Sequence, residues 1–264
     1  MKVATILPTR LLEHLDPKDD YHMCLFQEMQ READYFDFYK SQIEQGKFVI
    51  MDNGAAEGVN PGHEELAEVI EMVQPSEIVL PDIVNNKLET VKRSRAAYAY
   101  FMSKGYHETM NFMAVPQGET FAEWLACMKI FMRQEFVTTI GVSKFVTPQY
   151  QSIMGGGTNV RLECVDAILT QAEKLNRSID IHLLGCWSDP TEIGEIAKNF
   201  GDKVRGTDSA IAYVYTRNGK NYKPGLRRPD NAEIEFDRET IVDDDMITLL
   251  HKNMRRYIEV CEGR

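Results

Sequence analysis

The segment that decides the fold is EIVLPD, Glu77–Asp82, an apolar run that stops at a carboxylate. FVIMD (Phe48–Asp52) and VRGTD (Val204–Asp208) have the same form. Three further apolar runs stop at a polar residue or a glycine: AVPQG (Ala114–Gly118), TIGVS (Thr139–Ser143) and IHLLG (Ile181–Gly185). A helical pattern usually follows each run. This rhythm predicts an α/β protein with a TIM-type (β/α)8 barrel, whose parallel strands deliver side chains to one rim.

Seven strand–helix units are visible in the pattern. The expected strands are Val3–Leu7, Phe48–Met51, Ile78–Leu80, Phe112–Val115, Thr139–Val142, Ile179–Leu184 and Val204–Thr207. Tyr21–Gln45 is predicted to be one long helix, and Asp244–Glu262 to be the last helix. An eighth strand is expected in Ile211–Tyr215, where any irregularity of the barrel should lie. A doubly wound open sheet is the alternative, since periodicity does not separate the two.

The composition fits one globular domain over residues 1–264. Hydrophobic residues make up 43% of the chain, and no apolar run approaches the roughly 18 residues of a membrane span. The five cysteines are scattered without a CxxC pair, so disulfides and a cysteine-rich zinc site are not expected. We therefore expect a cytoplasmic protein (in a host's cytoplasm if phage-encoded) with no membrane partner. The sequence does not indicate an oligomeric state.

Charge argues against a surface that binds nucleic acid without specificity, because the net charge is −11. One segment differs from the rest of the chain. The run RNGKNYKPGLRR contains five basic residues and no acid: Arg217, Lys220, Lys223, Arg227 and Arg228. Such a run is consistent with a loop that follows a phosphate backbone, and equally with a solvated surface loop.

The polar residues at the strand ends are the candidate site. Asp52, Asp82 and Asp208 each have a simpler interpretation as a turn or helix-capping residue. Gln117 offers a donor and an acceptor, but it also fits a plain turn. Of the six histidines only His182 lies inside an expected core strand, where a histidine is more often a hydrogen-bonded core residue than a ligand. No HxH or HExxH spacing occurs, so we expect no metal and no cofactor.

Taken in order, the strand-end motifs resemble those of the tRNA-guanine transglycosylase superfamily, closest in character to the zinc-less phage and bacterial 7-deazaguanine DNA transglycosylases. That family reads Asp-Ser-Gly-Gly, a buried Asp, Val-Gln-Gly, Gly-Gly-Leu, Leu-Met-Gly, and a final Asp before Thr-Arg-Asn. The matching motifs here are Asp52-Asn53-Gly54, Asp82, Pro116-Gln117-Gly118, Ile140-Gly141-Val142, Leu183-Leu184-Gly185, and Asp208 followed by Thr216-Arg217-Asn218-Gly219.

The resemblance implies a glycosyltransferase that replaces guanine in DNA with a free 7-deazaguanine base. Asp208 would be the nucleophile that captures the sugar carbon, and Asp52 the general acid and base. The target base would leave its stack. The basic residues Arg217 to Arg228 would contact the nucleic-acid backbone. The residues expected to bind the purine are Asn53, Asp82, Gln117, Gly141, Leu184 and Gly185.

Departures from the family pattern keep other functions open. Only Cys261 and His251 follow Asp208 as potential zinc ligands, so the zinc module of the tRNA enzymes is missing. Asn53 replaces the family serine, and Ala56 stands where the family has an aromatic residue. The missing zinc module and the short chain, which leaves no room for tRNA-reading appendages, favour DNA over tRNA as the partner. The alternatives are a tRNA-directed enzyme, a non-catalytic partner subunit, and an unrelated barrel hydrolase of a sugar or nucleoside.

Overall fold

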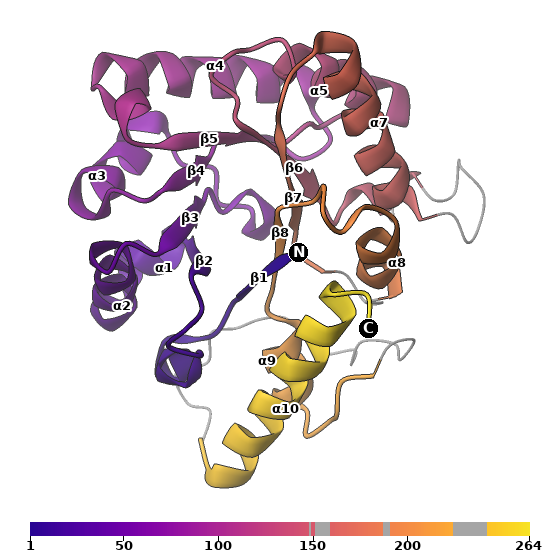
Figure 1. Ribbon diagram of the computed structural model, residues 1–264. Coiled ribbons are helices and arrows are strands. Elements are labelled where there is room, and N and C mark those ends of the chain that lie inside the picture. The colour runs from indigo at the N-terminus through magenta and orange to yellow at the C-terminus, as the bar shows by residue number, and fades with distance from the viewer. Residues whose placement is uncertain (148, 151–158, 187–190, 224–241) are drawn as a thin grey trace.

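Eight parallel strands form one rolled sheet in the computed structural model (Figure 1), which describes residues 1–264 except 148, 151–158, 187–190 and 224–241. Their order is β1-β8-β7-β6-β5-β4-β3-β2, with each neighbour hydrogen-bonded to the next. The expected TIM-type barrel is therefore confirmed, and the open doubly wound alternative is excluded. The strands are β1 (Lys2–Thr5), β2 (Tyr21–Leu25), β3 (Phe48–Asp52), β4 (Glu77–Val79), β5 (Asn111–Ala114), β6 (Thr139–Ser143), β7 (Asp180–Leu184) and β8 (Gly206–Ser209).

Helices surround this sheet on the outside (Figure 1). They are α1 (Phe26–Arg31), α2 (Ala33–Glu44), α3 (His63–Val73), α4 (Lys87–Ser103), α5 (Phe121–Phe131), α7 (Val160–Leu175), α8 (Thr191–Phe200), α9 (Ile211–Arg217) and α10 (Asp244–Cys261). Three 3₁₀ turns are η1 (Thr9–His14), η2 (Ala55–Glu57) and η3 (Tyr106–Glu108). The last helix, α10, packs against α8, α9 and β1, so the two ends of the chain meet on one side of the barrel.

In the described part of the chain, a side chain caps the N-terminus of four helices. Asn86, Thr120, Asn159 and Asp243 each accept a hydrogen bond from the backbone N–H three residues later, at the first turns of α4, α5, α7 and α10. Each cap satisfies a backbone donor that the helix itself leaves open. The pair Asp189-Pro190, whose sequence predicts an N-cap followed by a first-turn proline, lies outside the described residues.

The strands separate two apolar layers, because successive side chains point to opposite faces of a strand. A large cluster between the sheet and the helices contains Val49, Met51, Ile78 and Ile140. A smaller cluster fills the barrel interior. Its members are Ala4, Ile6, Tyr21, Met23, Leu25, Ile50, Val79, Met113, Val115 and Ala210. The interior is thus packed with side chains, so a bound molecule is expected at one of its ends.

Two predicted elements were wrong. Tyr21–Gln45 is not one helix, because Tyr21–Leu25 forms β2 and pairs in parallel with β3. All five β2 residues are buried, so the run shows no alternation, and α1 begins at the next residue without a turn signal. Ile211–Tyr215 is helical, and Ser209 ends the last strand. The missed strand near the N-terminus supplies the eighth member.

The barrel has a seam between β1 and β2. These strands lie beside each other, yet they stand at the two ends of the hydrogen-bonded order. An ion pair spans the seam at the bottom of the barrel, where Lys2 Nζ lies 3.0 Å from Asp20 Oδ2. Closure at this point therefore rests on side chains instead of a backbone ladder.

Among the helices of the described part, none has the length and apolar character needed to cross a membrane.

Candidate active site

Asp52 and Asp208 come to the same rim of the barrel. Asp52 is the last residue of β3, and Asp208 lies in β8 opposite Ala4 of β1. Asp82 and Gln117 follow β4 and β5 on the same side. The charges of Asp208 and Asp82 both contribute to the pKa of Asp52, so these carboxyl groups lie within electrostatic reach of one another. The acids named from the sequence therefore lie at one rim, and their catalytic roles stay a prediction.

The Asp52 carboxyl group is the most perturbed acid of the rim. Burial is the largest cause, followed by the charge of Glu57 and then that of Asp208, and together they raise its pKa to about 8. One hydrogen bond acts in the opposite sense, since the Gly54 N–H donates to Asp52 Oδ2 over 3.2 Å. At neutral pH this side chain is therefore mostly a neutral acid that has a proton to give.

We expect a ¹³C titration of the aspartate carboxyl carbons to show one midpoint at about 8, absent in Asp52→Asn. Glu57→Gln should lower that midpoint, because it removes the strongest neighbouring charge. Glu64→Gln is the matched control, since this exposed acid does not contribute to Asp52. An Asp52 midpoint near 4 would contradict the assigned role of proton donor.

Stability should follow the same titration. The folded protein keeps the Asp52 proton up to about pH 8, whereas the unfolded chain releases it near 3.8. The folded state thus binds more protons in this window, and the free energy of unfolding should fall as pH rises through it. Partial exposure of Asp52 limits the expected fall to on the order of 2 kcal/mol. Denaturant titrations of wild type and Asp52→Asn should differ in this slope.

The Asp208 carboxyl group is held through one of its oxygens. Oδ1 accepts hydrogen bonds from His182 Nε2 and from the Gly185 N–H, both at 3.0 Å. Oδ2 accepts none from the described residues. The side chain is only 7% exposed, and Oδ2 is the oxygen whose hydrogen-bonding capacity is left for a bound molecule.

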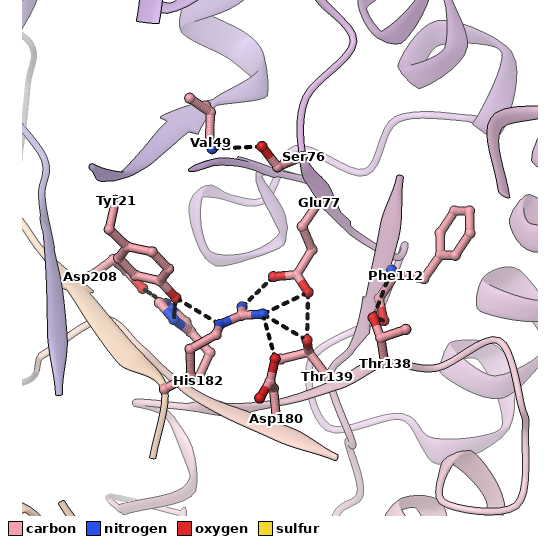
Figure 2. A network of polar contacts seen from close by, with 11 residues as sticks. Tyr21, Val49, Ser76, Glu77, Phe112, Thr138, Thr139, Asp180, His182 and Asp208 are labelled. Carbon is pink, nitrogen blue, oxygen red and sulfur yellow. Dashed lines mark hydrogen bonds and ion pairs between the residues drawn. The ribbon is translucent and has the colours of Figure 1, made fainter. Parts of the chain in front are cut away.

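A line of polar groups continues from Asp208 down the barrel axis (Figure 2). His182 Nδ1 lies 2.7 Å from the Tyr21 hydroxyl, which also accepts a hydrogen bond from Arg205 Nε at 3.1 Å. Arg205 forms an ion pair with the fully buried Glu77 at the opposite end of the barrel. The rim and the barrel floor are thus joined by continuous hydrogen bonding.

Asp82 is the centre of a separate network. Its Oδ1 accepts a hydrogen bond from Asn53 Nδ2 at 2.8 Å, and its Oδ2 one from Gln117 Nε2 at 2.7 Å. Burial is the largest influence on its pKa and outweighs these two hydrogen bonds, which gives a value of about 6. Asn53 Nδ2 also donates to the Leu80 carbonyl, so both hydrogen bonds that this nitrogen donates are made within the protein. In this structure the three residues bind one another across β3, β4 and β5.

The predicted glycine and leucine contacts have a packing explanation. A Cβ on Gly141 would lie within 2.8–3.1 Å of side-chain atoms of Leu184, Met113 and Val115. Gly141 and Leu184 therefore pack against each other inside the barrel. Gly185 has a clearer site role, since its N–H holds Asp208 and its φ of 67° is a conformation that glycine adopts without strain. Substrate binding by these residues stays a prediction.

The basic segment is only partly described. Arg217 ends α9, and Lys220 and Lys223 follow as exposed residues. Arg227 and Arg228 lie outside the described residues. A role of this segment in binding a DNA or tRNA backbone stays a prediction.

Several residues of the site were missed from the sequence. The sequence pattern placed Tyr21 in a helix, and Arg161 of α7 belongs to none of the motifs recognised in the sequence. His182 is a hydrogen-bonded core histidine as expected, but its partner Asp208 could not be foreseen from spacing. Glu57 and Lys144 were also missed, although Lys144 directly follows a strand end and could have been flagged by that position. Lys144 influences the pKa of Glu57, so both lie near the rim.

The described residues contain no group of three or more histidine, cysteine or acidic side chains arranged to hold a metal ion.

Comparison with solved structures supports the fold. An HpcH/HpaI aldolase/citrate lyase family protein from Burkholderia cenocepacia J2315 is similar with a TM-score of 0.51 and 8% identity, over 80% of this chain and 88% of that one. Methylaspartate ammonia lyase from Clostridium tetanomorphum has a TM-score of 0.48 and 13% identity, over 99% of this chain and 59% of that one. Protein CitE from Mycobacterium tuberculosis, in complex with magnesium and pyruvate, has a TM-score of 0.44 and 12% identity, over 96% of this chain and 98% of that one. No family model matches the sequence, and no curated protein matches it.

These findings overturn the expected family. The similar structure with a TM-score above 0.5 is an aldolase/citrate lyase family protein, and the transglycosylase resemblance has no support from a family model. Assignment to the tRNA-guanine transglycosylase superfamily, exchange of guanine for 7-deazaguanine in DNA, and glycosyltransferase chemistry were therefore wrong. The physical reason lies in the motifs, which are short strand ends. Aspartate, glutamine and glycine at these points also serve the barrel itself, as the Asp82 network and the packing at Gly141 illustrate.

Proposed function

We propose that this protein is a lyase-type acid–base enzyme that acts on a small polar substrate at the rim around Asp52 and Asp208. The observation that carries the proposal is the pairing of these two groups. Asp52 retains a proton near neutral pH, and Asp208 is held through Oδ1, while its Oδ2 accepts no hydrogen bond from the described residues. One group is suited to give a proton and the other to take one.

Bond cleavage without hydrolysis needs this combination. Asp208 removes a proton from a C–H group of the substrate. The electron pair left behind forms a new double bond as the bond to the leaving group breaks. Asp52 then gives its proton to the leaving group, so that charge does not accumulate on either fragment. Both carboxyl groups end the cycle with their protons exchanged and return to the starting state through solvent.

The surrounding charges restrict the substrate. Lys144 follows β6 and its alkyl chain lies against Gly185, which places its ammonium group near the acids of the rim. A carboxylate on the substrate would face Lys144 in preference to Asp52 or Asp208. We therefore propose small hydroxy acids or amino acids as the substrate class. The architecture shared with the aldolase/citrate lyase family protein agrees with this proposal at the level of the fold.

Proton abstraction can be measured before the substrate is known. A panel of small hydroxy acids and amino acids is incubated with the protein in D₂O, and proton NMR follows the loss of C–H signals and the appearance of cleavage products. Asp208→Asn should slow deuterium exchange by at least about 100-fold. Asp52→Asn should preserve exchange while suppressing cleavage, because it removes only the proton donor.

Asp166→Asn is the control, since this exposed acid lies on α7. Equal exchange in wild type and Asp208→Asn, or no exchange with any member of the panel, would contradict the proposal.

A further inference from the structure

Asp208 stands at the end of a line of buried groups that cannot themselves reach a substrate. His182 is completely buried and Tyr21 is 3% exposed. Each is hydrogen-bonded to the next, at 3.0 Å from Asp208 to His182 and 2.7 Å from His182 to Tyr21 (Figure 2). Arg205 completes the line from below, 3.1 Å from the Tyr21 hydroxyl.

The donor and acceptor roles in this line follow from its lower end. Arg205 Nε can only donate, so the Tyr21 oxygen accepts from it. Among the described residues, His182 Nδ1 is the acceptor within reach of the Tyr21 hydroxyl hydrogen, at 2.7 Å, so we assign Nδ1 as the acceptor. The remaining ring nitrogen, Nε2, therefore carries the hydrogen and donates to Asp208 Oδ1. This order fixes the neutral Nε2–H tautomer of His182.

The backbone prepares the space for this arrangement. His182 and Gly206 are register partners in β7 and β8. A Cβ on Gly206 would come within 2.7 Å of Tyr21 Cε1 and 2.9 Å of its hydroxyl oxygen. The missing side chain therefore makes room for the Tyr21 ring beside His182. Tyr21 is further held by stacking on Phe48, with ring centroids 5.6 Å apart and planes at 12°.

We propose that Tyr21 and His182 are positioning residues that keep Asp208 Oδ1 as a hydrogen-bond acceptor and leave Oδ2 to the substrate. The inference rests on the proposed function for its effect on catalysis, but the tautomer itself is a property of the resting protein. Loss of the Tyr21 hydroxyl would release His182 to place its hydrogen on either nitrogen. In the Nδ1–H form the ring no longer donates to Asp208, and the carboxyl group loses one of its two anchors.

The tautomer is measured directly by NMR of ¹⁵N-histidine-labelled protein, with the His182 signals assigned by their loss in His182→Gln. We expect a protonated Nε2 and an unprotonated Nδ1 in wild type. Tyr21→Phe keeps the ring and its stacking and should produce a mixture of tautomers. Gly206→Ala displaces the hydroxyl without removing it and should shift the His182 signals in the same direction. Tyr213→Phe is the matched control, because its buried hydroxyl has no hydrogen-bond partner among the described residues.

The second measurement is of kcat and KM, with a substrate found among the small hydroxy acids and amino acids tested above. Tyr21→Phe should lower kcat about 10- to 100-fold with KM nearly unchanged. This is the size of effect expected when a residue that orients a reactive group through hydrogen bonds is lost. A wild-type ring protonated at Nδ1, or a His182 spectrum that Tyr21→Phe leaves unchanged, would overturn the inference. So would a shifted tautomer with an unchanged kcat in a protein that Asp208→Asn inactivates. Full activity of Asp208→Asn would overturn the proposed function separately, while the His182 spectrum still decides the tautomer.

Discussion

Replacement of Arg205 by methionine should lower the free energy of unfolding by about 3–5 kcal/mol. Arg205 neutralises Glu77, whose side chain is completely buried at the floor of the barrel. Its Nη1 also lies 3.1 Å from Thr139 Oγ1 and 3.3 Å from Asp180 Oδ2. Burial disfavours the charged guanidinium, yet the hydrogen bond and charge of Glu77 hold the pKa of Arg205 above its ordinary value. Methionine would leave the Glu77 charge without this compensation.

Urea titration monitored by circular dichroism measures the loss. Arg256→Met is the matched control, because Arg256 forms an exposed ion pair with Glu259 on α10. We expect this control to cost under about 0.5 kcal/mol. The double variant Arg205→Met with Glu77→Gln should recover a large part of the loss, since the buried charge is then removed as well. Equal effects of Arg205→Met and Arg256→Met would contradict the interpretation.

Replacement of Arg161 by methionine should cost about 3–4 kcal/mol and also reduce activity. Arg161 is completely buried in α7. Its guanidinium donates to the carbonyl of Gly185 at 2.7 Å and to that of Val142 at 2.8 Å. These carbonyls lie at the ends of β7 and β6, so Arg161 fixes the backbone whose N–H anchors Asp208. Methionine would leave both carbonyls and the neighbouring Glu192 without the arginine.

Arg161→Lys separates the contributions of charge and geometry. Lysine keeps the positive charge but lacks the planar fork that reaches two carbonyls at once, so we expect an intermediate loss. Stability and the deuterium-exchange rate should be measured on the same preparations. Arg95→Met, at an exposed position of α4, serves as the control. An exchange rate unchanged in Arg161→Met would show that the Gly185 backbone does not depend on this residue.

The sequence predicted the barrel because most strands end in a recognisable way. Phe48–Asp52 and Thr139–Ser143 are followed by turns and helices, and their rim residues could be named in advance. Tyr21–Leu25 escaped this reasoning since it is buried along its whole length and continues directly into α1. Local pattern contains no information about such a strand. Its place is set by pairing with β3, which only the folded chain brings beside it.

The acidic residues of the candidate site were named from the sequence, but the residues that hold them in place were not. Asp52 and Asp208 could be named because a carboxylate at a strand end is visible in one sequence. His182 and Arg161 could not, because each acts on a residue about 25 positions away and from a different element. The reaction was misjudged for a related reason. Short strand-end motifs report the geometry of a barrel rim, and many chemistries use the same rim.

Because of the seam between β1 and β2, the eight strands form a rolled sheet with two free edges and not a fully hydrogen-bonded barrel. Strand β1 carries the register partner of Asp208 on one edge, while its other edge faces β2 without a ladder. Separating β1 from β2 would therefore break no backbone ladder between them, whereas moving β8 away from β7 would. Local opening of the barrel is therefore expected to start at this seam, beside the strand pair that carries Asp208, because no backbone ladder among the described residues opposes it there.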